Sequence, residues 1–213
     1  RVTKAKIHAF FSELRDAGPE PQGEVNYTSP YTRVVAVARS AQATDIGVNK
    51  ATKDLFKIVK TPEDMLKLGE AKLIDHIKSI GLYKTKAKNV MKAAQLLVDE
   101  FGSEVPENRD DLEKLPGVGR KTANVVLNIA FGHSTIAVDT HLFRVSNRTG
   151  LAPGSTPLAV EKKLLKKVPD EFMRHAHHWL ILHGRYVCKA RKPECDKCVV
   201  GDQCLFKGKL INS

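Results

Sequence analysis

The sequence predicts an all-α protein, and three features of its pattern support this fold class. Apolar residues recur at helical spacing along most of the chain, for example between residues 87 and 101. Helix start signals such as Thr61-Pro62 and Thr156-Pro157 stand directly before several of these stretches. Almost no segment alternates apolar and polar residues as a half-buried strand would. We therefore expect helices joined by loops and no sheet.

The N-terminal region predicts a helix, a linker and a second helix with an unusual composition. A stripe from Ile7 to Leu14 ends before Gly18, and residues 18–28 carry the prolines and glycine of a linker, which marks a candidate domain boundary. Ser29-Pro30 then begins an apolar helix that contains Arg33 and Arg39. Each arginine must reach a polar partner or solvent, or this helix lowers the stability of the protein.

The charge balance of the chain predicts a polyanionic partner. Its 213 residues include 35 Lys and Arg against 24 Asp and Glu, a formal net charge of +11. Such an excess suits nucleic acid or an anionic membrane surface. No apolar run approaches the roughly 18 residues of a membrane span, and no charged-then-apolar leader precedes the first helix. We expect no membrane insertion and a cytoplasmic location, at the nucleoid in a bacterium.

The segment from residue 109 to 131 predicts two helices joined by a glycine-rich hairpin. Gly117 and Gly119 allow the backbone to approach a ligand, and the amides at the start of the second helix can hold a phosphate. The same glycines also suit an ordinary turn. Lys121 lies in the first helical turn, where the helix dipole disfavours an ammonium and favours the neutral amine that a nucleophile requires. The alternative is a solvated lysine that contacts a phosphate.

Asp139 follows the apolar stretch 135–138 and precedes another helical segment. It is a good N-cap, so capping alone explains the residue. Hydrogen bonds from helix amides would also favour the ionised carboxylate. A fixed carboxylate near a neutral amine is a plausible pair for breaking a glycosidic bond.

All four cysteines lie near the C-terminus, with the spacing C-x6-C-x2-C-x5-C. They are Cys188, Cys195, Cys198 and Cys204. Two disulfides, a four-thiolate zinc site or an iron–sulfur cluster would each use such a set. The lack of a secretory leader disfavours disulfides. The spacing alone does not separate zinc from iron.

Several motifs resemble the endonuclease III family of DNA repair glycosylases. They cover the chain from about residue 30 to 206 in the family's order. The matching segments are the one from Leu115 to Leu127, which contains Leu115-Pro116-Gly117-Val118-Gly119-Arg120-Lys121-Thr122, then Val138-Asp139-Thr140-His141, Ser40-Ala41-Gln42-Ala43-Thr44-Asp45, Ile80-Gly81-Leu82-Tyr83 and the segment from His177 to Arg185. In this family the positions of Arg33 and Arg39 are normally aliphatic.

The resemblance implies a fold of two helical domains with a DNA-binding cleft between them. A helical barrel domain is expected over residues 22–133, with the helix-hairpin-helix at about 109–131. The second domain combines residues 1–21 with 134–213 and carries a [4Fe-4S] cluster loop at 188–204. The four cysteines would be the cluster ligands, and the cluster would be structural, holding the loop against a phosphate backbone.

The resemblance also implies the roles of individual residues. Lys121 is the expected nucleophile at C1′ of the sugar, and Asp139 its catalytic carboxylate. The expected DNA contacts are Gln42, Leu82, Gly117, Val118, Gly119, His141, Lys189, Arg191 and Lys192. Gln42 would fill the gap left by an extruded base and Leu82 would enter the base stack, a use known for exposed aliphatic residues. The three basic loop residues could equally be solvated, and the histidines from His175 to His183 are given no ligand role.

The function implied is base-excision repair of oxidised pyrimidines in double-stranded DNA. A lysine Schiff base would release the base, and β-elimination would nick the abasic site. We expect a monomer, since an all-α enzyme of this size needs no partner to close its core. Two alternatives remain. One is a monofunctional adenine-type DNA glycosylase, which the presence of Lys121 disfavours. The other is a non-catalytic iron–sulfur DNA-binding module, which would need neither Lys121 nor Asp139.

Overall fold

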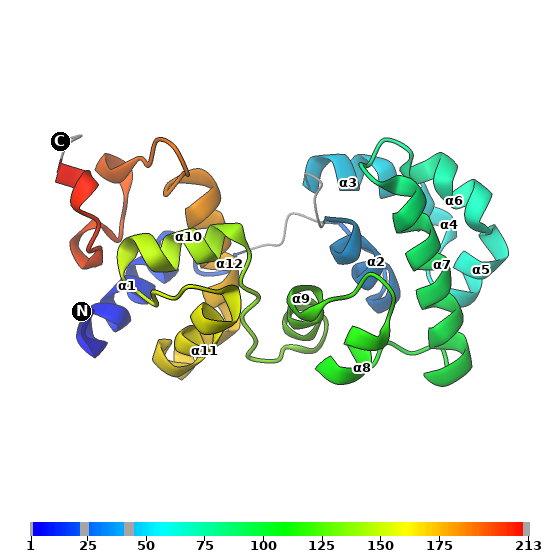
Figure 1. Ribbon diagram of the computed structural model, residues 1–213, viewed down its shortest axis with the longest axis horizontal. Coiled ribbons are helices and arrows are strands. Elements are labelled where there is room, and N and C mark those ends of the chain that lie inside the picture. The colour runs from blue at the N-terminus through cyan, green and yellow to red at the C-terminus, as the bar shows by residue number, and fades with distance from the viewer. Residues whose placement is uncertain (1, 22–25, 41–44, 211–213) are drawn as a thin grey trace. The chain divides into compact units, whose positions relative to one another are not determined.

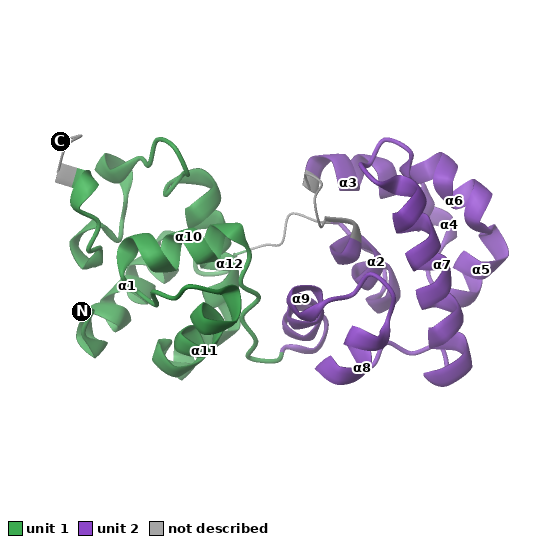
Figure 2. Cartoon of the chain, in the orientation of Figure 1, with its two compact units in different colours: residues 1–22, 133–213 green, residues 23–132 purple. Residues whose placement is uncertain are grey.

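The computed structural model describes residues 2–21, 26–40 and 45–210, and within these ranges every regular element is a helix (Figure 1). The all-α prediction is therefore confirmed, and no described residue lies in a strand. The helices divide between two compact units, one comprising Arg1–Gln22 with His133–Ser213 and the other Gly23–Gly132 (Figure 2). We call them unit 1 and unit 2. The domain boundaries expected from the sequence each lie one residue away from these limits.

Unit 2 is built around its longest helix, α7, which packs against α5 and α6, while α2 and α8 pack against α9. A single hydrophobic core joins these helices and includes the fully buried Met65, Leu73, Leu97 and Val126. The elements are α2 (Pro30–Ser40), α3 (Asp45–Thr52), α4 (Leu55–Ile58), α5 (Pro62–Leu68), α6 (Glu70–Ile77), α7 (Tyr83–Glu100), α8 (Arg109–Lys114) and α9 (Arg120–Phe131).

Unit 1 brings the N-terminal helix together with the last third of the chain, and α12 contacts both α1 and α10. Its core contains Phe10, Phe11 and Phe172, all fully buried. A Cβ at Gly184 would lie 2.9 Å from the Cβ of His141, so the glycine permits close packing of α12 on α10. The elements are α1 (Lys4–Ala17), α10 (Thr140–Thr149), α11 (Pro157–Lys167), α12 (Asp170–Tyr186), and the 3-10 turns η1 (Cys195–Lys197), η2 (Gly201–Gln203) and η3 (Lys207–Leu210).

Local start signals place the helix N-termini, as the sequence pattern indicates. Thr61 and Asp64 form a capping box at α5, where Pro62 is the first helical residue. Thr156 caps α11 with its side chain alone, its hydroxyl accepting a hydrogen bond from Ala159 N at 3.1 Å. These caps satisfy amide groups that a helix start otherwise leaves without partners.

Arg33, whose place in the apolar α2 was unexplained by sequence, reaches partners from within unit 2. Its Nη1 donates to the carbonyl oxygen of Ile129 at 2.5 Å, and its guanidinium lies 3.9 Å from the centre of the Tyr27 ring. Ile129 belongs to the last turn of α9, where a cation also complements the helix dipole. Arg33 therefore stabilises the contact of α2 with α9. The side chain of Arg39 lies outside the described residues.

Among the described residues, no helix combines the length and the apolar character needed to cross a membrane.

Candidate functional site

The hairpin between α8 and α9 has the backbone that its glycines predict. Gly117 has φ 83°, and a Cβ there would lie 3.2 Å from the Cβ of Asn89 on α7, so both conformation and space favour glycine. Val118 is buried and anchors the turn through its N–H bond to Leu115 O at 3.0 Å. Gly119 begins α9 without a side-chain cap. The hairpin is therefore anchored by the buried Val118 side chain. Gly117 and Gly119 form an edge, which we call the glycine edge, where the backbone can bind a phosphate.

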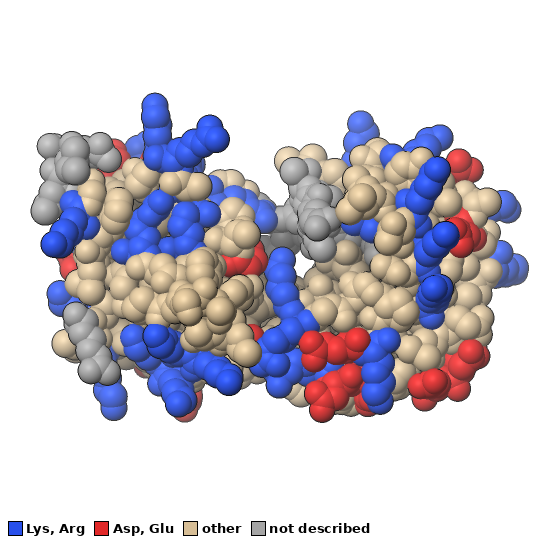
Figure 3. Space-filling model, viewed as in Figure 1, with Lys and Arg blue, Asp and Glu red and all other residues tan. Residues whose placement is uncertain are grey.

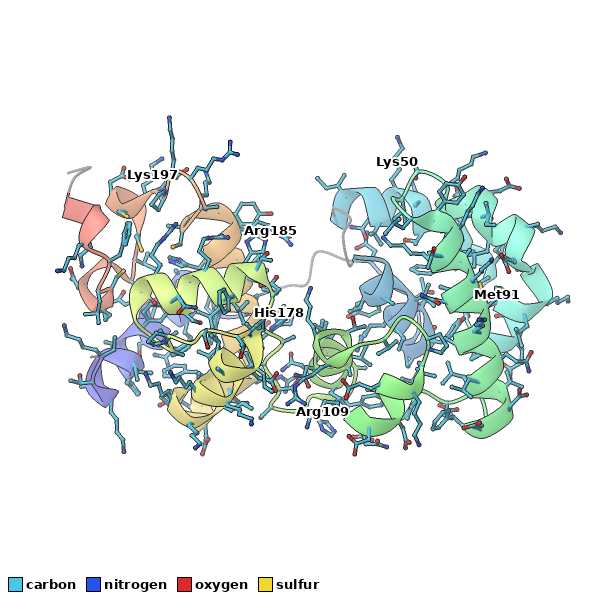
Figure 4. All side chains as sticks on the ribbon, in the orientation of Figure 1. Lys50, Met91, Arg109, His178, Arg185 and Lys197 are labelled. Carbon is cyan, nitrogen blue, oxygen red and sulfur yellow. The ribbon has the colours of Figure 1, made fainter. Side chains whose placement is uncertain are left out.

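Lys121 is the second residue of α9, and its side chain is exposed in unit 2. Within the described part of the chain it forms no ion pair with a carboxylate. The amine therefore stands beside the glycine edge without a fixed charge partner, although unit 2 does not bury it. Arg109, labelled in Figure 4, begins α8 and donates to Asn124 Oδ1 at 3.4 Å, which links the two helices that flank the hairpin.

Leu82 has an exposed and conformationally unusual position immediately before α7. Its side chain is 66% exposed, and its backbone is left-handed with φ 58° and ψ 30°. This conformation costs a non-glycine residue about 1–2 kcal/mol. Neither the exposure nor the strain is explained by packing within the core, so the residue stays a candidate for contact with a partner. Gln42, the other residue expected at the base stack, lies outside the described residues.

Asp139 caps α10, as a helix start at this position predicts. Its Oδ1 accepts a hydrogen bond from Leu142 N at 2.9 Å, while its main-chain carbonyl accepts one from Phe143 N at 2.8 Å. The carboxylate is half-buried, so its second oxygen can serve another group. His141 lies in the same first turn, with Nδ1 3.2 Å from Arg144 Nη2. Asp139 and His141 thus belong to unit 1, whereas Lys121, the hairpin and Leu82 belong to unit 2.

The cysteine loop is attached to α10 by two arginines that the sequence analysis missed. Arg144 donates from Nε to Cys188 O at 3.1 Å and from Nη2 to Gly184 O at 2.6 Å. Arg148 donates to the carbonyl oxygens of Lys189 and Ala190 at 2.6 and 2.9 Å, and its Nη1 lies 3.5 Å from Cys188 Sγ. The i, i+4 spacing of the two arginines was the available signal, because it places both on one helix face.

Further contacts hold the rest of the loop. Lys209 Nζ donates to Gly201 O at 2.6 Å and to Cys204 O at 2.7 Å, which fixes the last turn of the loop. The buried His183 places Nε2 3.8 Å from Cys198 Sγ. No ligand role is expected from the sequence for the histidines of α12, and the His183 ring contacts a cysteine. His177 instead accepts a hydrogen bond from Ala137 N at its Nδ1, at 3.2 Å.

The donor set of the loop fits an iron–sulfur cluster in its chemistry. The pKa of the Cys198 thiol is raised to about 11, chiefly by burial and also by the charges of Cys204, Cys188 and Cys195, so Cys198 lies within electrostatic reach of the other three cysteines. Burial likewise raises the pKa of Cys204. Thiolates at such positions require a cationic metal group to compensate them. Among the described residues, no three His, Cys, Asp or Glu side chains are placed so as to hold a single metal ion.

The three basic residues expected to contact DNA from this loop differ in their surroundings. Lys189 forms an ion pair with Glu194, whose pKa is lowered chiefly by that hydrogen bond and by the charges of Lys189 and Lys197. Figure 4 labels Lys197 on the same loop, and its Nζ lies 3.7 Å from Glu194 Oε2. Arg191 and Lys192 are exposed and pair with no carboxylate in the described ranges. These two carry the loop's available positive charge.

Comparison with known protein families agrees with this set of features. The family model described as HhH-GPD superfamily base excision DNA repair protein matches residues 35–170, which include the hairpin, Lys121 and Asp139. A second model, the iron–sulfur binding domain of endonuclease III, matches residues 188–204, the span of the four cysteines. The fold and the hairpin thus define a base excision DNA repair protein of the HhH-GPD superfamily.

Individual relatives narrow this class. Endonuclease III of Escherichia coli (strain K12) is 54% identical over 209 residues, covering 98% of this chain and 99% of that protein. Endonuclease III of Treponema pallidum (strain Nichols) is 52% identical over 198 residues, or 93% and 94% of the two chains. A solved structure of a trapped endonuclease III–DNA covalent intermediate, an estranged-adenine complex, matches with a TM-score of 0.92 at 43% identity and full coverage of both chains.

The chain belongs to the endonuclease III family. It is accordingly a base-excision repair enzyme, a DNA glycosylase and abasic-site lyase, and its cofactor is a [4Fe-4S] cluster. The expectations of family, fold, enzyme class and cofactor are therefore confirmed.

Proposed function

We propose that this enzyme removes oxidised pyrimidines from double-stranded DNA, with Lys121 as the nucleophile and Asp139 as the carboxylate that assists it. The observation that carries this proposal is the position of Lys121, an exposed amine without an ion-pair partner at the start of the helix that follows the glycine hairpin. The trapped covalent complex of the 43% identical endonuclease III supports a reaction through a covalent bond to DNA. A non-catalytic DNA-binding module would need no such bond.

The chemistry follows from an amine that attacks a sugar. The neutral Nζ of Lys121 forms a bond to C1′ as the bond from C1′ to the base nitrogen breaks, and the departing base takes up the proton that the amine loses, passed on by Asp139. The carboxylate of Asp139 stabilises positive charge on the sugar and accepts the proton that the amine loses. Loss of the ring C1′–O bond gives a Schiff base. Its electron withdrawal acidifies the C2′ proton, whose removal expels the 3′ phosphate and nicks the strand.

Residues of each unit contribute binding in this proposal. Gly117, Val118 and Gly119 hold a phosphate through backbone groups, and Leu82 enters the base stack, together with Gln42, where a nucleotide is extruded. His141, Lys189, Arg191 and Lys192 contact the backbone from unit 1. Extrusion costs a few kcal/mol and least for a poorly stacked, damaged base, so it contributes to selectivity.

We infer that Cys188, Cys195, Cys198 and Cys204 hold the cluster and that the enzyme acts as a monomer. When bound, the cluster joins four thiolates from one loop and so fixes that loop's shape. The attachments of Arg144 and Arg148 to the first part of the loop support this structural role. In a bacterium we expect the enzyme to act at the nucleoid.

The test is borohydride trapping on a duplex with one oxidised pyrimidine, comparing wild type with Lys121→Ala and Lys121→Arg. Arginine keeps the positive charge and a phosphate contact but remains protonated, so it cannot attack. We expect a covalent adduct in the wild type only, with duplex binding retained in Lys121→Arg. An adduct in Lys121→Arg would assign the nucleophile to another amine. Base release by the wild type without an adduct would indicate activated water, and neither product would favour a binding module.

A further inference from the structure

Helix α7 carries a row of lysines on the face away from its core. Lys84, Lys88 and Lys92 are all exposed and follow one another at i, i+4 and i+8. The buried side of the same helix is formed by residues such as Ala87 and Val90. Since an α-helix rises 1.5 Å per residue, neighbouring members of the row are about 6 Å apart along the axis. We call these three residues the α7 lysine row.

The charge of the α7 lysine row is not compensated within the protein. Elsewhere in unit 2, Lys57 pairs with Asp54 at 2.7 Å and Lys114 with Asp111 at 2.6 Å. No carboxylate of the described residues forms an ion pair with any member of the row. Each member has another lysine of the row four residues away, and like charges at this spacing destabilise a helix. The row therefore does not serve the stability of α7.

The row lies on the helix that also supports two predicted DNA contacts. Residue Tyr83, the first of α7, directly follows the exposed, left-handed Leu82. Asn89, the neighbour of Lys88 in sequence, is the side chain against which Gly117 of the hairpin packs. In the space-filling view, basic side chains form a column over α7 (Figure 3). A nucleic acid that contacts Leu82 and the hairpin would therefore run close to this helix.

We propose that the α7 lysine row binds backbone phosphates of the DNA duplex beside the extruded nucleotide. This inference rests on the proposed function, because it takes Leu82 and the hairpin as the neighbouring contacts. Lysine ammonium groups bind phosphates as point charges and read no base, so the row adds affinity that is independent of sequence and of damage. It lets the enzyme hold undamaged duplex while it searches, and it anchors one flank of the damaged site.

The test compares the salt dependence of binding for two variants of equal charge change. The row variant is Lys84→Gln/Lys88→Gln/Lys92→Gln. The control is Lys60→Gln/Lys67→Gln/Lys72→Gln, three exposed lysines of unit 2 that are not on α7. Binding to an undamaged duplex is measured by fluorescence anisotropy between about 50 and 200 mM salt, where each lost phosphate contact lowers the slope of log K against log salt by about 0.9.

We expect the row variant to lower the slope by about 2–3, so the wild-type affinity falls roughly 40-fold more than that of the variant over this range. The control variant should keep the wild-type slope. Glutamine is a good helix former and removes the like-charge repulsion, so the row variant should unfold at the wild-type temperature or above. Equal slopes for the two variants would overturn the proposal. Equal slopes with lost binding to phosphatidylserine vesicles would instead assign the row to a membrane surface.

Borohydride trapping at saturating enzyme separates this proposal from the proposed function. The row variant should still form the covalent adduct on a damaged duplex, because Lys121 is unchanged. If the wild type forms no adduct while the difference in slope remains, the proposed function fails and the phosphate contact stands. If the adduct forms and the slopes are equal, the inference about the row fails alone.

Discussion

Asp139 combines a structural hydrogen bond with the proposed catalytic charge, and two substitutions separate these roles. Its Oδ1 accepts from Leu142 N at 2.9 Å at the start of α10. Asp139→Ala removes this cap, which costs about 0.5–2 kcal/mol. For a chain of this size about 1 kcal/mol lowers the Tm by roughly 2–4 °C. Asp139→Asn keeps a capping oxygen and loses only the negative charge at the helix start, which lowers the stability by about 0.3–1 kcal/mol.

The rate of base release should not follow the order of stability of the two variants. If the carboxylate assists the attack of Lys121, both variants should slow single-turnover base release by about 10²–10⁴-fold. Thr156→Ala is the matched control, because Thr156 makes the same kind of cap at α11 in the same unit, to Ala159 N at 3.1 Å. It should lower the Tm like Asp139→Ala and leave base release unchanged. Wild-type base release by Asp139→Asn would show that the residue is a cap alone, and strong loss of activity in Thr156→Ala would attribute the defect to stability.

Two further predictions concern unit 1. Arg148→Met removes the hydrogen bonds to Lys189 O and Ala190 O, each worth about 0.5–1.5 kcal/mol. We therefore expect the visible absorbance of the cluster to be lost faster in the presence of a chelator than in the wild type. An unchanged rate would contradict the inference that Arg148 holds the cysteine loop. Burial, with a smaller effect of the charge of His175, lowers the pKa of His178 below 6.5 in the folded protein. The unfolded chain therefore binds this proton more readily than the folded protein does, and the free energy of unfolding falls as the pH drops below about 6.5. His178→Phe should therefore lower the Tm difference between about pH 7.5 and 5.5, measured by circular dichroism, and an unchanged difference would assign that dependence to other groups.

The fold could be predicted from the sequence largely because its signals are local. Thr61-Pro62 and Thr156-Pro157 define helix starts within a few residues, and helical periodicity defines the buried faces. The partner of Arg33 could not be found in this way. It is the carbonyl of Ile129, 96 residues away, and it becomes available only when the end of α9 meets α2. A side chain that breaks an apolar pattern thus indicated that a partner must exist, but only helix packing identified it.

In the candidate site, too, the sequence predicts the site residues but not the contacts that position them. Motifs predict Lys121, Asp139 and the cysteines as site residues, since the proposed chemistry requires these residue types at fixed spacing. The holding contacts of the cysteine loop use main-chain oxygens instead, as with Arg144 to Cys188 O and Lys209 to Gly201 O. Every residue offers such an oxygen, so sequence cannot show which one an arginine or lysine will reach. The pairing of Lys189 with Glu194 likewise follows from the bend of the loop, and it removes one of three charges that composition alone would count toward DNA.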